Sequence, residues 1–298
     1  MPKILIDILP AQGHLNGSLK LALMLKNAGY EVLYLNMKPF QIVLEKFGFP
    51  TSSNNQYERQ FEISKRRFNF KFFINGLFFT SRKKILEREK LEFQSFKRFI
   101  ADIKPDLVLL DDQNMLKAAY YKMCDVPVVC LDNLPESGML ENIPPYSSFF
   151  IPSKSLYSKL FCKVSWCIKT FQNNCRLTKI QLNSIGTDFY SATIRIAKQN
   201  NLQLRGQMDL KRGYGLGIKN IHHIIVAPVD FDFPHKVAEN VFNIGPLVDI
   251  KREGEINRPR YNTLRKNLED LKMKNKVSFY IVLWVQLQWR FSEERISF

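Results

Sequence analysis

The sequence predicts an α/β protein with a Rossmann-like parallel sheet and helices on both of its faces. Short aliphatic runs alternate with amphipathic segments, and a unit of strand, helix and strand occurs twice, at residues 3–35 and 104–131. Such crossovers are right-handed and place the two strands parallel in one sheet. Apolar residues make up 45% of the 298 residues, which is enough for a buried core, so disorder is not expected.

The first unit opens with residues 3–9, an aliphatic run typical of a strand buried on both faces. Apolar side chains then recur at helical spacing up to Ala28, and Ser18 is expected to cap this helix. Gly29 stands where helices commonly end, and residues 32–35 are expected to form the next strand.

The second unit predicts a strand at residues 106–110, a helix at 114–123 and a strand at 126–131. Two further segments favour long helices outside this pattern. Residues 61–99 are rich in Phe, Lys and Arg, and residues 155–181 place apolar side chains on one face of a basic helix.

Three parts are expected along the chain. Residues 1–250 form the first domain, which includes a further strand at residues 222–226. Residues 251–276 are charged and polar, as in an interdomain linker, and residues 277–298 begin with another strand and are expected to be the start of a second domain.

The net charge of +16 is concentrated in two regions. Residues 58–104 hold 13 Lys and Arg against 6 Asp and Glu, and residues 142–187 hold six Lys and Arg and no acidic residue. This charge favours anionic partners, but it does not choose among lipid headgroups, nucleic acid and phosphorylated substrates.

The sequence also predicts where the chain resides. Residues 1–9 lack the pattern of a secretion signal, and no apolar run reaches about 18 residues, so we expect a cytoplasmic protein. The five cysteines lack paired spacing and are expected to be reduced thiols rather than a zinc site.

Candidate catalytic residues follow two of the predicted strands. His14 follows the first strand, and Asp111 and Asp112 end the strand of the second unit. Ligands of open α/β sheets bind at the carboxyl ends of the strands, so the imidazole and a carboxylate are expected to form a His-Asp pair. One of the two aspartates is expected to cap the following helix, which leaves the other for His14.

The other histidines predict no metal site. His222 and His223 are adjacent in a predicted strand, so they should face opposite sides of the sheet.

Four ordered segments together resemble family 1 glycosyltransferases, the UDP-glucosyltransferase and macrolide transferase type with a GT-B fold. The first is residues 10–16 (PAQGHLN) with the helix and strand that follow, and the second is residues 104–111 (KPDLVLLD) with the Val126-Pro127 strand. The third and fourth are residues 231–234 (FDFP) and 243–249 (NIGPLVD).

The resemblance implies an inverting, metal-independent transfer of a hexose from a nucleotide sugar, for which a UDP-sugar is expected, to a hydroxyl group of a hydrophobic acceptor. His14 would be the base that deprotonates this hydroxyl group, and Asp111 would hold His14, with Asp112 as the alternative for that role. Gly13, Asn16 and Asp112 would contact the substrate. The nucleotide sugar would be a co-substrate, and neither a resident cofactor nor a metal is implied.

The resemblance covers residues 3–250 and stops after one further strand, at Trp284, without the family's Gly-rich donor-binding turn. This implies a chain truncated after its N-terminal domain. Two alternatives stay open: an inactive acceptor-binding module, and a basic protein bound peripherally at the inner membrane face. An anionic membrane is the more expected of the macromolecular partners, and nucleic acid the less expected.

Overall fold

The computed structural model describes residues 1–52, 79–146, 148–184, 186, 188–213 and 216–247, together with Thr263 and Lys266. The chain divides into the units Met1–Val248 and Asp249–Phe298, and the elements described below belong to the first. The expected linker, apart from Thr263 and Lys266, and the strand expected at Val277 lie outside the described residues.

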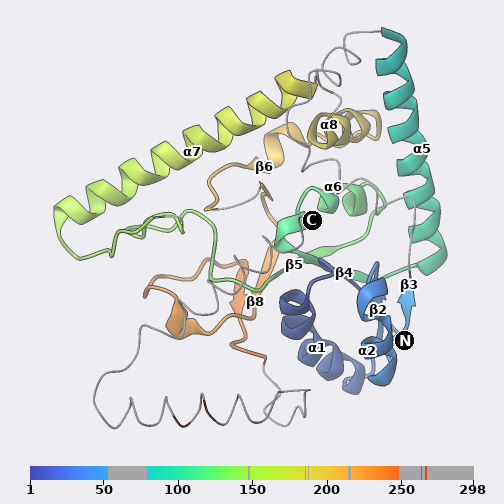
Figure 1. Ribbon diagram of the computed structural model, residues 1–298, viewed down its shortest axis with the longest axis horizontal. Coiled ribbons are helices and arrows are strands. Elements are labelled where there is room, and N and C mark those ends of the chain that lie inside the picture. Colours follow the sequence, from blue (N-terminus) through green and yellow to red (C-terminus); the bar gives the residue numbers. More distant parts are fainter. Residues whose placement is uncertain are drawn as a thin grey trace. The chain divides into compact units, whose positions relative to one another are not determined.

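A seven-stranded parallel sheet forms the centre of the first unit, which confirms the predicted class (Figure 1). The strand order is β3-β2-β1-β4-β5-β8-β9. The strands are β1 Lys3–Asp7, β2 Glu31–Leu35, β3 Thr51–Ser52, β4 Leu107–Asp111, β5 Val128–Asp132, β8 His222–Ile225 and β9 Val241–Asn243.

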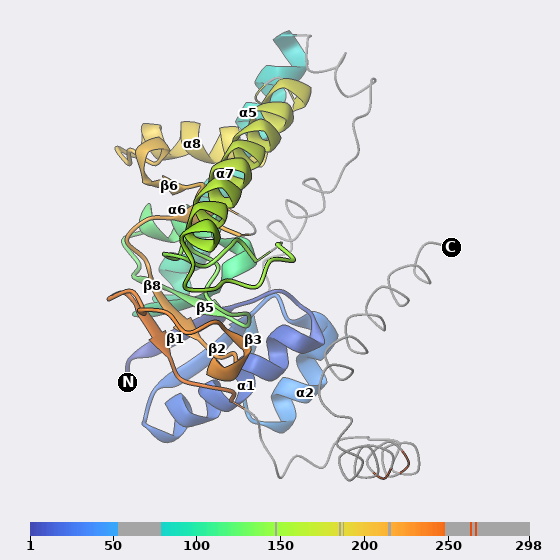
Figure 2. The same cartoon turned by 90° about the vertical axis from the view of Figure 1, so that its left-hand side faces the viewer.

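Helices cover both faces of this sheet. The helices that do so are α1 Gln12–Asn27, α2 Gln41–Lys46, α5 Phe79–Ile103, α6 Lys117–Lys122 and α8 Phe189–Gln199, and a further helix, α7, spans Leu156–Ser184. Helices α1 and α2 pack on one face, and α5, α6 and α8 pack on the other (Figures 1 and 2).

The alternation of side chains along β1 explains the two cores. Ile4 and Ile6 point to the face that α1 and α2 cover, whereas Leu5, between them, points to the face of α5, α6 and α8. All three side chains are buried, because a parallel sheet with helices on both faces leaves neither side exposed.

The expectation that Ser18 caps the first helix is wrong. Helix α1 begins at Gln12, with Ala11 at its N-cap and no side-chain cap. The chain turns directly after Leu9, since the backbone N–H of Ala11 donates to the Leu9 carbonyl over 2.7 Å. Ser18 is buried inside the helix, where its hydroxyl donates to the Leu15 carbonyl over 3.0 Å. His14 therefore belongs to the first turn of α1.

The two long helices expected from composition are partly described. Helix α5 covers the second part of the range 61–99, while residues 53–78 lie outside the described residues. Helix α7 confirms the helix expected at 155–181, and it runs away from the sheet (Figure 1). A short antiparallel pair, β6 Met208–Asp209 and β7 Gly217–Ile218, follows α8.

Two further observations concern the cysteines and the apolar character of the helices. All five cysteines are free thiols. Among the helices that the structure describes, none has the length and apolar character needed to cross a membrane.

Candidate functional site

The candidate site lies at the carboxyl edge of the sheet, where the strand order reverses. Strand β1 is flanked by β2 on one side and β4 on the other, and the chain leaves β1 and β4 at the same edge. Open α/β sheets bind their ligands at such a switch point, because the loops after the two strands diverge there and leave space.

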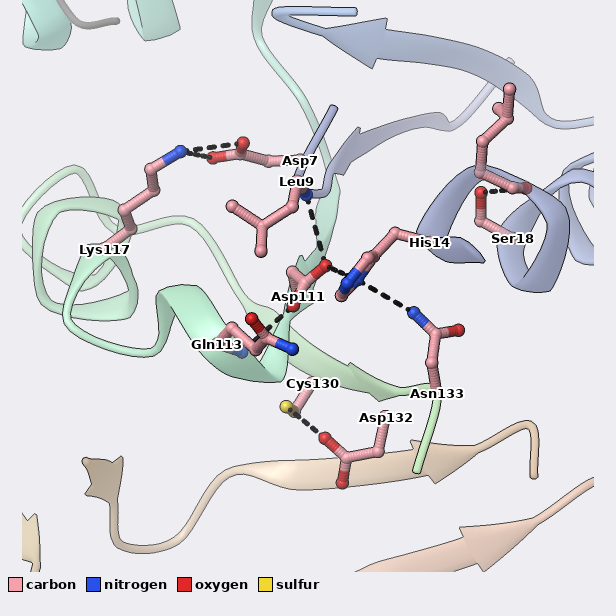
Figure 3. Close-up of polar contacts among 11 residues, drawn as sticks. Asp7, Leu9, His14, Ser18, Asp111, Gln113, Lys117, Cys130, Asp132 and Asn133 are labelled. Atoms are coloured by element: carbon pink, nitrogen blue, oxygen red, sulfur yellow. Dashed lines mark hydrogen bonds and ion pairs between the residues drawn. The ribbon is translucent and has the colours of Figure 1, made fainter. Parts of the chain in front are cut away.

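His14 and Asp111 meet at this edge, as the sequence predicts (Figure 3). The Nδ1 atom of His14 lies 2.5 Å from Oδ2 of Asp111. The Asp111 side chain is fully buried, while 12% of the His14 side chain is exposed. The Nε2 atom makes no hydrogen bond to the residues that the structure describes, so one ring nitrogen is held and the other is available to a ligand.

Backbone donors fix the Asp111 carboxylate. The N–H of Leu9 donates to Oδ2 over 3.1 Å, and the N–H of Gln113 donates to Oδ1 over 3.0 Å. Asp111 is thus the N-cap of the short 3₁₀ turn Asp112–Asn114 and the partner of His14 at once. The expected division, in which one aspartate caps and the other pairs, is wrong, because the two oxygens of one carboxylate serve both purposes.

The environment shifts the pKa values of the pair in opposite directions. Burial lowers the pKa of His14, but the hydrogen bond to Asp111 and the charges of Asp111 and Asp112 outweigh it and raise that pKa above its ordinary value. Burial raises the pKa of Asp111, but the contact with His14 and the two backbone hydrogen bonds outweigh it and lower that pKa. The carboxylate is therefore ionised near neutral pH, and His14 donates the Nδ1 proton to it.

Asn133 is a third member of the site that the sequence did not single out. It follows β5 directly, and its Nδ2 atom lies 3.1 Å from Nδ1 of His14. The other amide atom, Oδ1, is buried and has no hydrogen-bond partner among the described residues. The position after β5 is the signal that was available, since β5 ends at the same edge as β1 and β4.

The three residues expected to contact substrate surround the pair in different ways. Gly13 and Asn16 are exposed on the first turns of α1, and Oδ1 of Asn16 accepts a hydrogen bond from the Gln12 side chain over 2.7 Å. Asp112 is buried and acts on His14 through its charge. Their contact with a substrate stays a prediction.

A buried ion pair ends β1 next to the site. Lys117 of α6 donates to Oδ1 of Asp7 over 3.0 Å, and the Tyr121 hydroxyl donates to Oδ2 over 2.8 Å (Figure 3 shows the Lys117 contact). Buried charges are tolerated when they are paired and hydrogen-bonded, so this pair fixes α6 against the end of β1.

A second buried His-Asp contact lies between β5 and β8. Nδ1 of His223 lies 2.8 Å from Oδ2 of Asp132, and the Cys130 thiol donates to Oδ1 of Asp132 over 2.9 Å. The expectation that His222 and His223 face opposite sides is confirmed, since His222 is exposed and His223 is buried. The Cys130, Asp132 and His223 atoms that could hold a metal all lie within 4.8 Å of one another.

A pocket of about 220 Å³, lined by apolar residues and by polar ones such as Glu136 and Asp232, begins two residues after Asn133. Its wall includes Leu140, Ile143, Phe149, Phe150 and Trp166. Most of these residues belong to the segment between β5 and α7, which is the segment that begins with Asn133.

No protein-family model and no curated protein matches this sequence. Among solved structures, the chain is similar to the glycotransferase of kitacinnamycin, with 16% identity over 87% of this chain and 56% of the other and a TM-score of 0.47. It is also similar to CalG4, the calicheamicin glycosyltransferase, with 15% identity over 83% of this chain and 53% of the other and a TM-score of 0.44. SsfS6, a glycosyltransferase of Streptomyces sp. SF2575, shows 12% identity over 82% and 53% and a TM-score of 0.37. The chain spans about half the length of these three proteins.

Proposed function

We propose that the chain is the acceptor-binding part of a glycosyltransferase, in which His14 removes the proton from an acceptor hydroxyl group. The observation that carries this proposal is the contact between Nδ1 of His14 and the buried Asp111 carboxylate at the switch point of the sheet. The motifs around both residues, which resemble those of family 1 glycosyltransferases, support the same reaction.

The chemistry follows from the geometry of the pair. Asp111 holds the proton on Nδ1, so the lone pair of Nε2 can take the proton of the acceptor hydroxyl group. The acceptor oxygen then forms a bond to C1 of a nucleotide-linked hexose, the bond from C1 to the diphosphate oxygen breaks, and the nucleoside diphosphate leaves with that electron pair. Asp111 stabilises the imidazolium that forms.

The acceptor is a hydrophobic compound that carries a hydroxyl group. The pocket after Asn133 combines aromatic and aliphatic side chains with a few polar ones, a lining that suits a hydrophobic compound with a hydroxyl group. The donor is a nucleotide sugar, with UDP-hexoses as the first choice. Its binding needs groups beyond those that the described residues place near His14.

The test combines a transfer assay with a binding assay on the full chain. The protein is incubated with UDP- or TDP-hexoses and a panel of hydrophobic alcohols and phenols, and the glycosylated product is measured by mass spectrometry. The substitution His14→Gln is expected to lower the rate by about 10² to 10⁴. His222→Gln, which changes an exposed histidine on β8, is the matched control and should leave the rate unchanged.

The outcomes separate two functions. Product that is lost in His14→Gln supports sugar transfer with this base, and product that persists in that variant contradicts the role of His14. Acceptor binding without product, measured by calorimetry, indicates an acceptor-binding module that does not transfer sugar. The absence of both glycosylated product and acceptor binding would refute the proposal.

A further inference from the structure

Helix α7 presents a long apolar surface to solvent. Eight of its large apolar side chains are each more than 40% exposed, and we refer to them as the α7 stripe. The stripe consists of Leu156, Tyr157, Leu160, Phe161, Val164, Ile168, Phe171 and Leu182. At 1.5 Å per residue it extends for about 40 Å along the helix.

The opposite side of α7 attaches the helix to the protein. Trp166 is buried and donates from Nε1 to the Ile143 carbonyl over 2.8 Å. Asn173 donates to the carbonyl groups of Leu210 and Arg212 over 2.8 and 3.1 Å. Helix α7 therefore buries Trp166 and Leu177 together with polar side chains such as Asn173, yet it exposes most of its large apolar side chains, unlike an ordinary surface helix.

Positive charges flank the stripe on both sides. Helix α7 carries five Lys and Arg residues and no Asp or Glu. With 3.6 residues per turn, Lys159 and Lys163 lie at one margin of the stripe, and Lys169, Arg176 and Lys179 lie at the other. The aliphatic stems of such side chains can lie along an apolar surface while their charged ends reach anionic groups beside it.

The loop before α7 extends this surface. Phe149 is fully exposed and Ile151 is 75% exposed, and both belong to the loop that leads into α7 at Leu156. Phe150, between them, packs on Phe161 of the stripe with ring centroids 4.4 Å apart. The loop and the stripe are therefore one continuous apolar surface at the N-terminal end of α7.

We propose that the α7 stripe, together with Phe149 and Ile151, docks the protein on an anionic lipid membrane. The helix lies in the plane of the interface, with the stripe at the boundary between headgroups and acyl chains and the flanking lysines on lipid phosphates. The occupant is a lipid surface because acyl chains match the broad apolar stripe and anionic headgroups match the cationic margin on each side of it.

The charges and apolar side chains of α7 favour a lipid membrane over a second copy of the chain and over nucleic acid. In a second copy of the chain, an identical stripe would bring cationic margins against cationic margins with no acidic residue of α7 between them. Nucleic acid would engage the cations but would leave the eight apolar side chains in water, since phosphate contacts dominate its affinity.

The test measures binding of the full chain to vesicles of phosphatidylcholine, with and without one quarter phosphatidylglycerol, by flotation over a salt series. The protein is expected to bind the anionic vesicles and to lose affinity as salt rises. Leu160→Glu and Phe171→Glu should each weaken binding by about ten-fold or more, because each removes an inserted apolar side chain. Lys159→Gln and Lys163→Gln should each weaken it by about five-fold.

The matched control is Leu91→Glu, which changes a leucine that is 66% exposed on α5 and should leave vesicle binding unchanged. His14→Gln should also bind vesicles as the unchanged protein does, so this surface is tested separately from the catalytic proposal. A fluorophore on exposed Cys175, in a Cys167→Ser chain, should shift its emission to the blue on anionic vesicles.

Three results would overturn the proposal. The first is that the protein does not bind anionic vesicles at low salt. The second is that Leu91→Glu weakens binding as much as the stripe variants do, and the third is that Leu160→Glu and Phe171→Glu bind as tightly as the wild-type protein. Sedimentation velocity provides the remaining check. A dimer that Leu160→Glu dissociates would assign the stripe to a second copy of the chain instead.

Discussion

Gly17 of α1 lies directly against Asn133, so that a methyl group at Gly17 would overlap the amide oxygen of Asn133. Gly13, one turn earlier on the same helix, has no atom within 4 Å of the corresponding position. The absence of a side chain at Gly17 therefore lets Asn133 reach His14, and the two glycines differ in a way that substitution can measure.

Alanine at these two glycines should have opposite effects on stability. Gly13→Ala should raise the free energy of unfolding by up to about 1 kcal/mol, since alanine favours the helix. Gly17→Ala should lower it, because Asn133 must move. In an Asn133→Ala background the closest remaining contact at Gly17 is Val226 at 3.4 Å, so the same substitution should become neutral or stabilising. Urea unfolding of the four variants measures this, and equal effects at both glycines would contradict it.

Asp111→Asn should slow the proposed sugar transfer and shift the pH dependence of its rate. The base form of His14 appears as pH rises through a pKa that Asp111 holds above its ordinary value. Removing the carboxylate charge should lower that pKa, so the acidic limb of the rate profile should move to lower pH while the maximal rate falls by about 10² to 10⁴. Rates measured across pH, with an NMR titration of His14, check both effects, and an unshifted titration would refute the electrostatic role.

The same pair should make stability depend on pH. The contribution of His14, whose pKa is raised on folding, is present below about pH 6.5 and lost as pH rises through the folded pKa. The contribution of Asp111, whose pKa is lowered, is present above about pH 3.9 and lost as pH falls through the folded pKa. The free energy of unfolding of the wild-type protein should therefore exceed that of His14→Gln by the largest amount between about pH 3.9 and pH 6.5. A difference that does not vary with pH would contradict the assignment.

Replacing only one partner of the buried Asp7–Lys117 ion pair should destabilise the protein more than replacing both partners. Lys117→Met leaves the Asp7 carboxylate buried without its cation and should lower the free energy of unfolding by about 3 to 5 kcal/mol. Asp7→Asn combined with Lys117→Met should cost much less than the sum of the single changes. The surface pair of Lys3 and Glu31 is the matched control, since its partners are 27% and 49% exposed and Lys3→Met should cost at most about 1 kcal/mol. Denaturant unfolding of the wild-type protein, Asp7→Asn, Lys117→Met, the double variant and Lys3→Met measures these effects, and additive effects of the two single changes would exclude coupling.

The sequence predicted the sheet and the central pair because both depend on local patterns. Aliphatic runs mark β1 and β4, and the rule that ligand groups follow parallel strands brings His14 to Asp111. The start of α1 was misplaced because Ser18 has the chemistry of a cap, whereas the turn at Leu9 and Ala11 starts the helix without one. The contact of Asn133 with His14 depends on how closely α1 approaches β5, which no spacing in the sequence encodes.

The sequence likewise did not predict that the apolar stripe on α7 faces solvent. The spacing of Leu156, Leu160 and Val164 predicts an apolar face, but the buried contacts of Trp166 and Asn173 decide which side of the helix meets the protein. A hydrophobic pattern ordinarily indicates the buried side of a helix, and here it marks the exposed one.

The position of β1 in the middle of the sheet also constrains how the chain is made. Strand β1 is flanked on both sides only when β4, about one hundred residues later, has been synthesised, which takes roughly 5 to 20 s at ordinary elongation rates. During that interval one edge of an aliphatic strand has no neighbour, and unpaired edges of this kind recruit other strands. Nascent chains that end before β4 therefore expose this edge, and the contact of His14 with Asp111 forms only once β4, which pairs with that edge, has been made.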